Sequence, residues 1–187
     1  YETAATCTVA VTATSADTST SVTTFTVAVT DIDEANVVAP SDSDSATNTM
    51  AENVANDATV GVTAVATDAD GTTNVISYTV TAQSCASVFT VGSATGIVAV
   101  ADNTAIDYET ATSCTVEVTA TSTDTSTAAT TFTVAVTDID EVDVGSVTDS
   151  NGDTNTMAEN VANGATVGLT AVATDADGTT NVISYTV

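Results

Sequence analysis

The 187-residue chain contains no Lys, Arg or His, whereas 25 Asp and Glu side chains give it a formal charge of −25. No carboxylate can therefore be neutralised by a side-chain salt bridge. Each must be solvated, hydrogen-bonded to backbone, or bound to a cation from solution. The same absence excludes nucleic acid as a partner, because phosphates require basic side chains, and it disfavours bare anionic lipid.

Without His or Lys the chain cannot assemble a Ser–His or Cys–His pair or form a Schiff base. Two carboxylates acting together, as in glycosidases, remain a distant alternative. Because there is no basic residue or Trp to line a sugar subsite, acid pairs are better explained as metal ligands. We predict that the chain is not an enzyme.

Aromatic residues are scarce, at 4% of a chain that is 43% hydrophobic and draws mostly on Ala and Val. A core built from such small side chains is thin and needs stabilisation by disulfides or ions. No apolar run approaches the length of about 18 residues that a membrane helix needs, so no membrane span is expected.

The chain repeats itself at an offset of 107 residues. Residues 1–34 recur at 108–141 with 28 of 34 positions unchanged, and residues 50–80 recur at 157–187 with 29 of 31 unchanged. This repetition predicts three domain segments. They are the C-terminal part of one repeat (1–34), a complete repeat (35–141) and the N-terminal part of the next (142–187), as in a window cut from a longer array.

Hydrophobic residues within the repeat alternate with a period of two, as Cys114, Val116 and Val118 do with intervening polar residues. Such alternation predicts strands with one buried face. About seven short strands in roughly 100 residues are typical of a Greek-key β-sandwich, so we predict an all-β fold of tandem seven-stranded sandwiches. The expected strands are 47–54, 58–66, 75–81, 88–91, 97–100, 114–120 and 132–136.

The two copies differ most between these matched blocks. Residues 35–49 and 142–156 agree at only 6 of 15 positions and are rich in Asp, Ser, Asn and Gly. This tract could be a binding surface, but its composition favours a solvated spacer of irregular structure.

Acidic residues cluster where strands end, for example as Asp68 and Asp70 before Gly71. In an extended chain, Asp-x-Asp places both carboxylates on one side, which suits a hard cation. Solubilising loop residues would look similar. The spacing is, however, reproduced in both copies while the neighbouring spacer diverges, which favours metal, with calcium as the best candidate.

Several acidic motifs occur in a particular order along the repeat. They are Ala-Glu52-Asn, Asp68-Ala-Asp70-Gly followed by Asn74, Asp107-Tyr-Glu109, and Asp138-Ile-Asp140-Glu141. In this order they resemble the cadherin repeat, and more narrowly the cadherin-like repeats of giant bacterial surface adhesins. That resemblance implies calcium ions between successive domains, where they stiffen the rod.

The resemblance also implies which residues bind calcium at each junction between repeats. At the second junction they are Glu52, Asp107, Glu109, Asp138, Asp140, Glu141, Asp175, Asp177 and Asn181. At the first junction they are Glu2, Asp31, Asp33, Glu34, Asp68, Asp70 and Asn74.

The chain departs from the family pattern in two places, and these leave the number of ions per junction open. Asp140, Glu141 and Val142 stand where the family linker has Asn, Asp and Asn. A later Asp of the family falls at Ser122, with Asp124 displaced by two residues.

The three cysteines are Cys7, Cys85 and Cys114, and Cys7 is the repeat equivalent of Cys114. Because Cys85 lies near the start of one expected strand and Cys114 opens another, we predict a Cys85–Cys114 disulfide within the repeat. Free buried thiols or inter-chain bridges are the alternatives. A disulfide implies an oxidising, extracytoplasmic compartment.

We therefore expect a calcium-stiffened structural or adhesive repeat of a long extracellular fibre or surface adhesin. Its partners would be neighbouring repeats of the same chain and like chains in a filament. The alternative is a repeat that itself binds a partner, by homophilic pairing or carbohydrate recognition. The near-identical copies favour the first hypothesis, because a recognition surface would show aromatic or Arg anchors.

Overall fold

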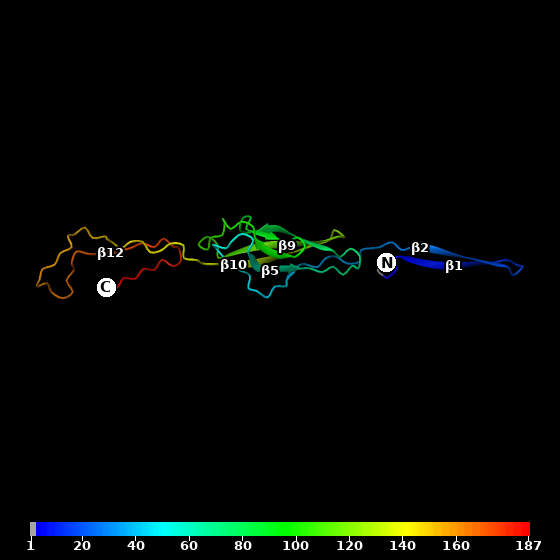
Figure 1. Ribbon diagram of the computed structural model, residues 1–187, viewed down its shortest axis with the longest axis horizontal. Coiled ribbons are helices and arrows are strands. Elements are labelled where there is room, and N and C mark those ends of the chain that lie inside the picture. Colours follow the sequence, from blue (N-terminus) through cyan, green and yellow to red (C-terminus); the bar gives the residue numbers. More distant parts are fainter. Residues whose placement is uncertain (1–2) are drawn as a thin grey trace.

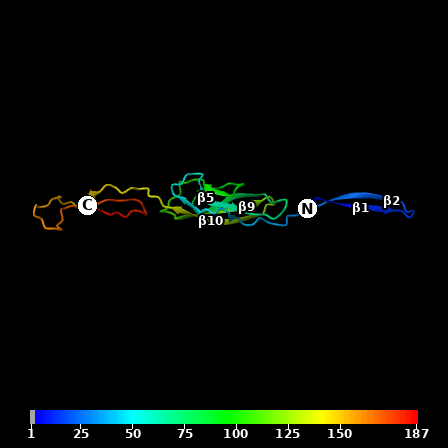
Figure 2. The same ribbon diagram turned by 60° about the horizontal axis from the view of Figure 1, so that its bottom comes forward.

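The structure is a computed structural model and describes residues 3–187. Within this range the chain folds into strands, turns and irregular segments, without helices. A central sandwich separates an N-terminal hairpin from the C-terminal segment 142–187, which extends in the opposite direction (Figures 1 and 2). The described residues include no helical segment with the length and hydrophobicity of a membrane span.

The central sandwich consists of two four-stranded sheets, with strand orders β4-β10-β9-β6 and β3-β5-β8-β7. This arrangement confirms the predicted all-β sandwich. Eight elements replace the seven expected because a two-residue strand, β3, forms within the predicted spacer 35–49, ahead of the first expected strand, which corresponds to β4. The elements are β3 (Ser41–Asp42), β4 (Thr49–Ala51), β5 (Thr59–Val65), β6 (Ile76–Gln83), β7 (Phe89–Val91), β8 (Ile97–Val100), β9 (Ser113–Ser122) and β10 (Thr127–Thr137).

The period-two pattern sets which side chains enter the core. In β9, burial alternates strictly along the strand, and Val116 and Val118 are fully buried. The facing sheet contributes valines of β5 and β8 that are equally enclosed. Valine fits such a pleated, buried surface well. The fully buried core valines are Val60, Val62, Val88, Val98, Val100, Val116, Val118 and Val134.

Gly96 closes the tight turn between β7 and β8. Its φ of +70° lies in the left-handed region, and a Cβ atom there would lie 1.9 Å from the carbonyl oxygen of Ala64. Only glycine meets both requirements without strain. The close approach lets this hairpin pair alongside β5.

A disulfide joins Cys85 to Cys114, with the two Cα atoms 5.6 Å apart. It links the chain just after β6 to β9, as predicted from the sequence. Cys7, the repeat equivalent of Cys114, is a free and exposed thiol.

The N-terminal hairpin repeats the pairing of β9 and β10. It consists of β1 (Thr6–Thr14) and β2 (Thr20–Ala28), and Cys7 faces Val27 as Cys114 faces Val134. Within residues 3–187 no second sheet packs against this hairpin. Its apolar side chains are therefore exposed. Phe25 is 52% exposed, whereas its equivalent Phe132 is 8% exposed.

The C-terminal segment repeats the pairing of β3 with β5. In it β11 (Thr148–Asp149) pairs with β12 (Ala171–Val172) in antiparallel fashion. The predicted irregular spacers 35–49 and 142–156 thus each contain a two-residue strand. Polar strands this short carry no alternation that the sequence could reveal.

Candidate metal centre at the junction between repeats

The second junction is where the linker 138–141, which follows β10, meets the loop 175–181 of the next repeat. Glu52 lies directly after β4 and is only 7% exposed. Its carboxylate accepts hydrogen bonds from the backbone amides of Tyr108, at 2.8 Å, and Ile139, at 2.6 Å. One buried glutamate thereby fixes both the turn that carries Glu109 and the linker.

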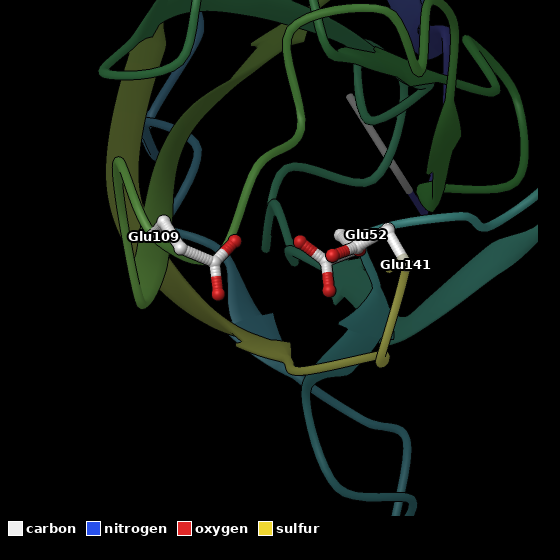
Figure 3. Close-up of side chains that lie close together, drawn as sticks. All are labelled: Glu52, Glu109 and Glu141. Carbon is white, nitrogen blue, oxygen red and sulfur yellow. The ribbon is translucent and has the colours of Figure 1, made fainter. Parts of the chain in front are cut away.

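Carboxylates of this junction converge in two groups of three. Glu52, Glu109 and Glu141 form one group, and Glu109, Asp138 and Asp177 form the other. Within each group, oxygens from the three residues lie within 4.8 Å of one another. Figure 3 shows the carboxylate of Glu109 facing those of Glu52 and Glu141 across an open space. Glu109, common to both groups, connects the central sandwich to the next repeat.

A hollow of about 430 Å³ opens at the first of these groups. Its lining is mainly acidic, so it offers oxygen ligands and no positive side chain. The lining residues are Glu52, Asn53, Ile106, Asp107, Glu109 and Glu141.

The crowding of carboxylates changes their acidities. A hydrogen bond shared with Glu52, then burial and the charges of Glu52, Glu109 and Asp177, raise the pKa of Glu141 to about 7. Burial, reinforced by the neighbouring acids, also raises the pKa of Glu109. The amide of Tyr108 lowers the pKa of Glu52. Like charges held this close favour binding of a cation.

The next repeat contributes its Asp-x-Asp-Gly loop. Backbone amides of Thr180 and Thr179 hold the pKa of Asp177 far below its usual range, so this buried carboxylate remains ionised. Its Oδ2 also accepts a hydrogen bond from the amide of Glu141, at 3.4 Å. The hydroxyl of Thr179 donates to Oδ2 of Asp138, at 2.6 Å. These two bonds hold the loop against the linker.

Asp138 offers an oxygen that is free to bind a cation. This oxygen, Oδ1, is buried and has no hydrogen-bond partner within residues 3–187. A buried unpaired carboxylate oxygen is costly and calls for an explanation such as an ion. The residues present at this junction therefore fit a divalent cation.

The remaining predicted ligands of this junction lie outside the two groups of three. Asp107 lines the hollow, and the hydroxyl of Thr110 lowers its pKa. Asp140 is exposed. Oδ1 of Asp175 accepts the amide of Asp177, and the side chain of Asn181 donates to the carbonyl of Gly178.

The first junction, where linker 31–34 meets loop 68–74, repeats the same contacts. The amide of Glu34 donates to Oδ2 of Asp70, at 3.4 Å, and the hydroxyl of Thr72 donates to Oδ2 of Asp31, at 2.5 Å. Here Oδ2 of Asp68 is the buried oxygen without a partner in the described chain. Backbone amides of Thr72 and Thr73 hold the pKa of Asp70 far below its usual range.

Other predicted residues of the first junction are less closely grouped. Both groups of three carboxylates found within residues 3–187 belong to the second junction. Asp33 and Asn74 are exposed. Glu2 lies outside the described residues.

Asp124 joins the first junction, although it is not among the ligands predicted from the sequence. It lies in the turn between β9 and β10, near Asp33. Partial removal from water, and then the charge of Asp124, raise the pKa of Asp33. Burial acts to raise the pKa of Asp124 as well, but hydrogen bonds from Ser126 outweigh it and leave this pKa lowered. Its recurrence as Asp17 in the other copy is the signal that could have identified it.

Comparisons with known proteins point to one family. Residues 46–137 match the family model of the cadherin domain. No curated protein sequence matches the chain.

Solved structures similar to this chain include cadherin extracellular domains. Domains 3–6 of protocadherin gamma B2 align with a TM-score of 0.59 and 20% identity, over 94% of this chain and 44% of that one. Domains 1–4 of PcdhgB3 give a TM-score of 0.65 and 20% identity, over 93% and 41%. Domains 22–24 of mouse cadherin-23 give 0.57 and 18%, over 94% and 55%. This chain thus spans about half or less of these structures.

Proposed function

Because residues 46–137 belong to the cadherin domain family, we propose that this chain is a calcium-stiffened structural or adhesive segment of a long extracellular protein. Cadherin domains are non-enzymatic adhesion modules. The internal offset of 107 residues supports the division into 1–34, 35–141 and 142–187 as parts of three successive repeats.

The observation that carries this proposal is the convergence of acids from both sides of the second junction. Glu52 and Glu109 come from the central sandwich, Asp138 and Glu141 from the linker, and Asp177 from the next repeat. A chain with no Lys, Arg or His cannot offset this cluster itself. A cation from solution would turn repulsion across the junction into attraction.

Calcium suits this set of ligands better than other common ions. It accepts six to eight oxygen ligands in flexible geometry, whereas Mg²⁺ demands near-ideal octahedral coordination. The two groups of three carboxylates would hold calcium, and Asp107, Asp140, Asp175 and Asn181 are proposed as further ligands. The ion supplies charge neutralisation, and the protein supplies a fixed angle between repeats.

Location and partners follow from the same proposal. The Cys85–Cys114 disulfide supports an oxidising compartment outside the cytoplasm. The parent protein would be a cell-surface adhesin, such as those of bacteria, or a secreted filament. The immediate partners of each repeat would be the neighbouring repeats of the same chain. Like chains of the filament would be further partners.

The proposal is tested by following the shape of the 187-residue chain in calcium and in chelator. Small-angle X-ray scattering should show a longer, narrower distribution of distances in excess calcium than in EGTA, because the ion bridges the linker and the next repeat. An Asp138→Asn, Asp177→Asn double variant should lose most of this difference.

The matched control for this test is Asp153→Asn, which removes one exposed acid from the spacer. It should behave as the unmodified chain does. Identical scattering of the unmodified chain in calcium and in EGTA, with an unchanged melting temperature, would contradict the proposal.

A further inference from the structure

A threonine hydroxyl crosses each junction and contacts the linker before its own repeat. Thr179 Oγ1 donates to Asp138 Oδ2 at 2.6 Å, and Thr72 Oγ1 donates to Asp31 Oδ2 at 2.5 Å. The two pairs are related by the repeat offset of 107 residues. Each pair joins residues 41 positions apart in sequence, so the contact forms only when the loop of one repeat reaches the linker.

The same hydroxyl also lies near a second carboxylate of its own loop. Thr179 Oγ1 is 3.1 Å from Asp177 Oδ1, and Thr72 Oγ1 is 3.1 Å from Asp70 Oδ1. A hydroxyl has one hydrogen to donate. The shorter distance assigns that hydrogen to the linker aspartate, where a charged acceptor makes the bond stronger than one between neutral groups.

This bond makes the two oxygens of Asp138 different from one another. Oδ2 receives the hydroxyl of Thr179, whereas Oδ1 is buried without a partner in the described chain. The terminal torsion of an Asp side chain is broad, so the plane of an unrestrained carboxylate would not keep one direction. The hydroxyl of Thr179 therefore fixes the plane of the Asp138 carboxylate and the direction in which Oδ1 faces a ligand.

We propose that Thr179 and Thr72 are positioning residues for calcium, which orient Asp138 and Asp31 toward the ion without binding it. This inference rests on the calcium-dependent function proposed above. Thr179 acts through Asp138, as residues behind metal ligands commonly do, and loss of such support costs about 10–100-fold in metal affinity. It also couples formation of the site to arrival of the next repeat.

The experiment measures calcium binding to the calcium-free 187-residue chain by isothermal titration calorimetry. Thr179→Val keeps the shape of the side chain but removes the hydroxyl, and it should weaken binding at the second junction by about 10-fold. Thr179→Ser restores the hydroxyl and should return affinity to within about twofold of the unmodified chain, a rescue that packing alone does not predict. Asp177→Asn identifies the sites of this junction in the titration.

Thr166→Val is the control, because it exchanges the same side chains at an exposed position of the next repeat. It should leave calcium affinity unchanged. If the unmodified chain binds calcium and Thr179→Val binds it equally well, or if Thr179→Ser fails to rescue, the positioning role is wrong while the proposed function stands. If the unmodified chain does not bind calcium, both are wrong.

Discussion

Glu52 and Glu141 are a pair of neighbouring carboxyl groups at the junction whose pKa values differ. They share a hydrogen bond, with Glu52 further anchored by two backbone amides and Glu141 exposed at the linker. The pKa of Glu52 is therefore lowered, whereas that of Glu141 is raised to about 7, so Glu141 holds the proton of the pair. A divalent ion would replace the shared proton.

This pair predicts an inverted pH dependence for the calcium-free chain. The pKa of Glu141 rises from 4.5 to about 7 on folding, so the folded form binds the proton more tightly. The stability that this provides is complete below about pH 4.5 and is lost as pH rises through 7. In EGTA, the melting temperature should thus be lower at pH 7.5 than at pH 5.5, because the stability contributed by protonated Glu141 is lost between these two pH values.

The control for that prediction is Glu141→Gln, which cannot titrate and should flatten this part of the profile. In excess calcium the trend should reverse, because the ion binds the deprotonated carboxylates. An identical pH profile for Glu141→Gln and the unmodified chain would show that the pair does not share a proton.

The loop of the next repeat approaches the central sandwich closely at Gly178. A Cβ atom on Gly178 would lie 2.3 Å from Cγ of Glu109, which belongs to both carboxylate groups. The next repeat therefore approaches the central sandwich more closely at this point than any residue with a side chain would allow.

Gly178→Ala should push Glu109 out of place and weaken calcium binding by about 10-fold, the order expected for a disturbed ligand shell. Gly152→Ala is a matched control, because a Cβ atom there meets nothing within 4 Å. Titration calorimetry compares the two. Equal calcium affinities for both variants would mean that Glu109 can move aside without loss.

The disulfide between β9 and the end of β6 offers a separate prediction. It closes a loop with a sequence separation of 29 residues in a sandwich whose core is mostly valine. Replacing Cys85 and Cys114 together by Ala should reduce the free energy of unfolding by about 3–4 kcal/mol on the chain-entropy model. Urea denaturation measures this.

Cys7→Ala is the corresponding control, because Cys7 is a free, exposed thiol on the isolated hairpin. It should leave the unfolding of the central sandwich unchanged. Equal urea midpoints for the double variant and the unmodified chain would indicate that the disulfide adds no stability.

Strands and disulfide could be predicted from the sequence because their signals are local. Strict alternation around Val116 and Val118 marks a half-buried strand, and the two cysteines each lie beside one. The two-residue strands β3 and β11 were not predictable, since their pairing depends on neighbours and not on their own side chains.

The details of the site depend on contacts that only the folded chain creates. Spacing and resemblance predicted Glu52, Glu109, Asp138, Glu141 and Asp177, all of which converge. The Thr179–Asp138 bond spans 41 residues and gives no local signal. Asp124 could have been predicted from its recurrence as Asp17, but its approach to Asp33 depends on how a turn faces the linker.

The whole molecule is elongated, with the hairpin, the central sandwich and the C-terminal segment arranged in series (Figures 1 and 2). The same bonds recur at both junctions, so each repeat contacts its neighbour through two different surfaces, head to tail. Contacts of this kind form a ring where the rotation closes and an open helical array where it does not, and the elongated arrangement corresponds to the open case. The carboxylates at the junction would then set the pitch of a many-repeat array, and a small change in the angle between two repeats would accumulate along its length.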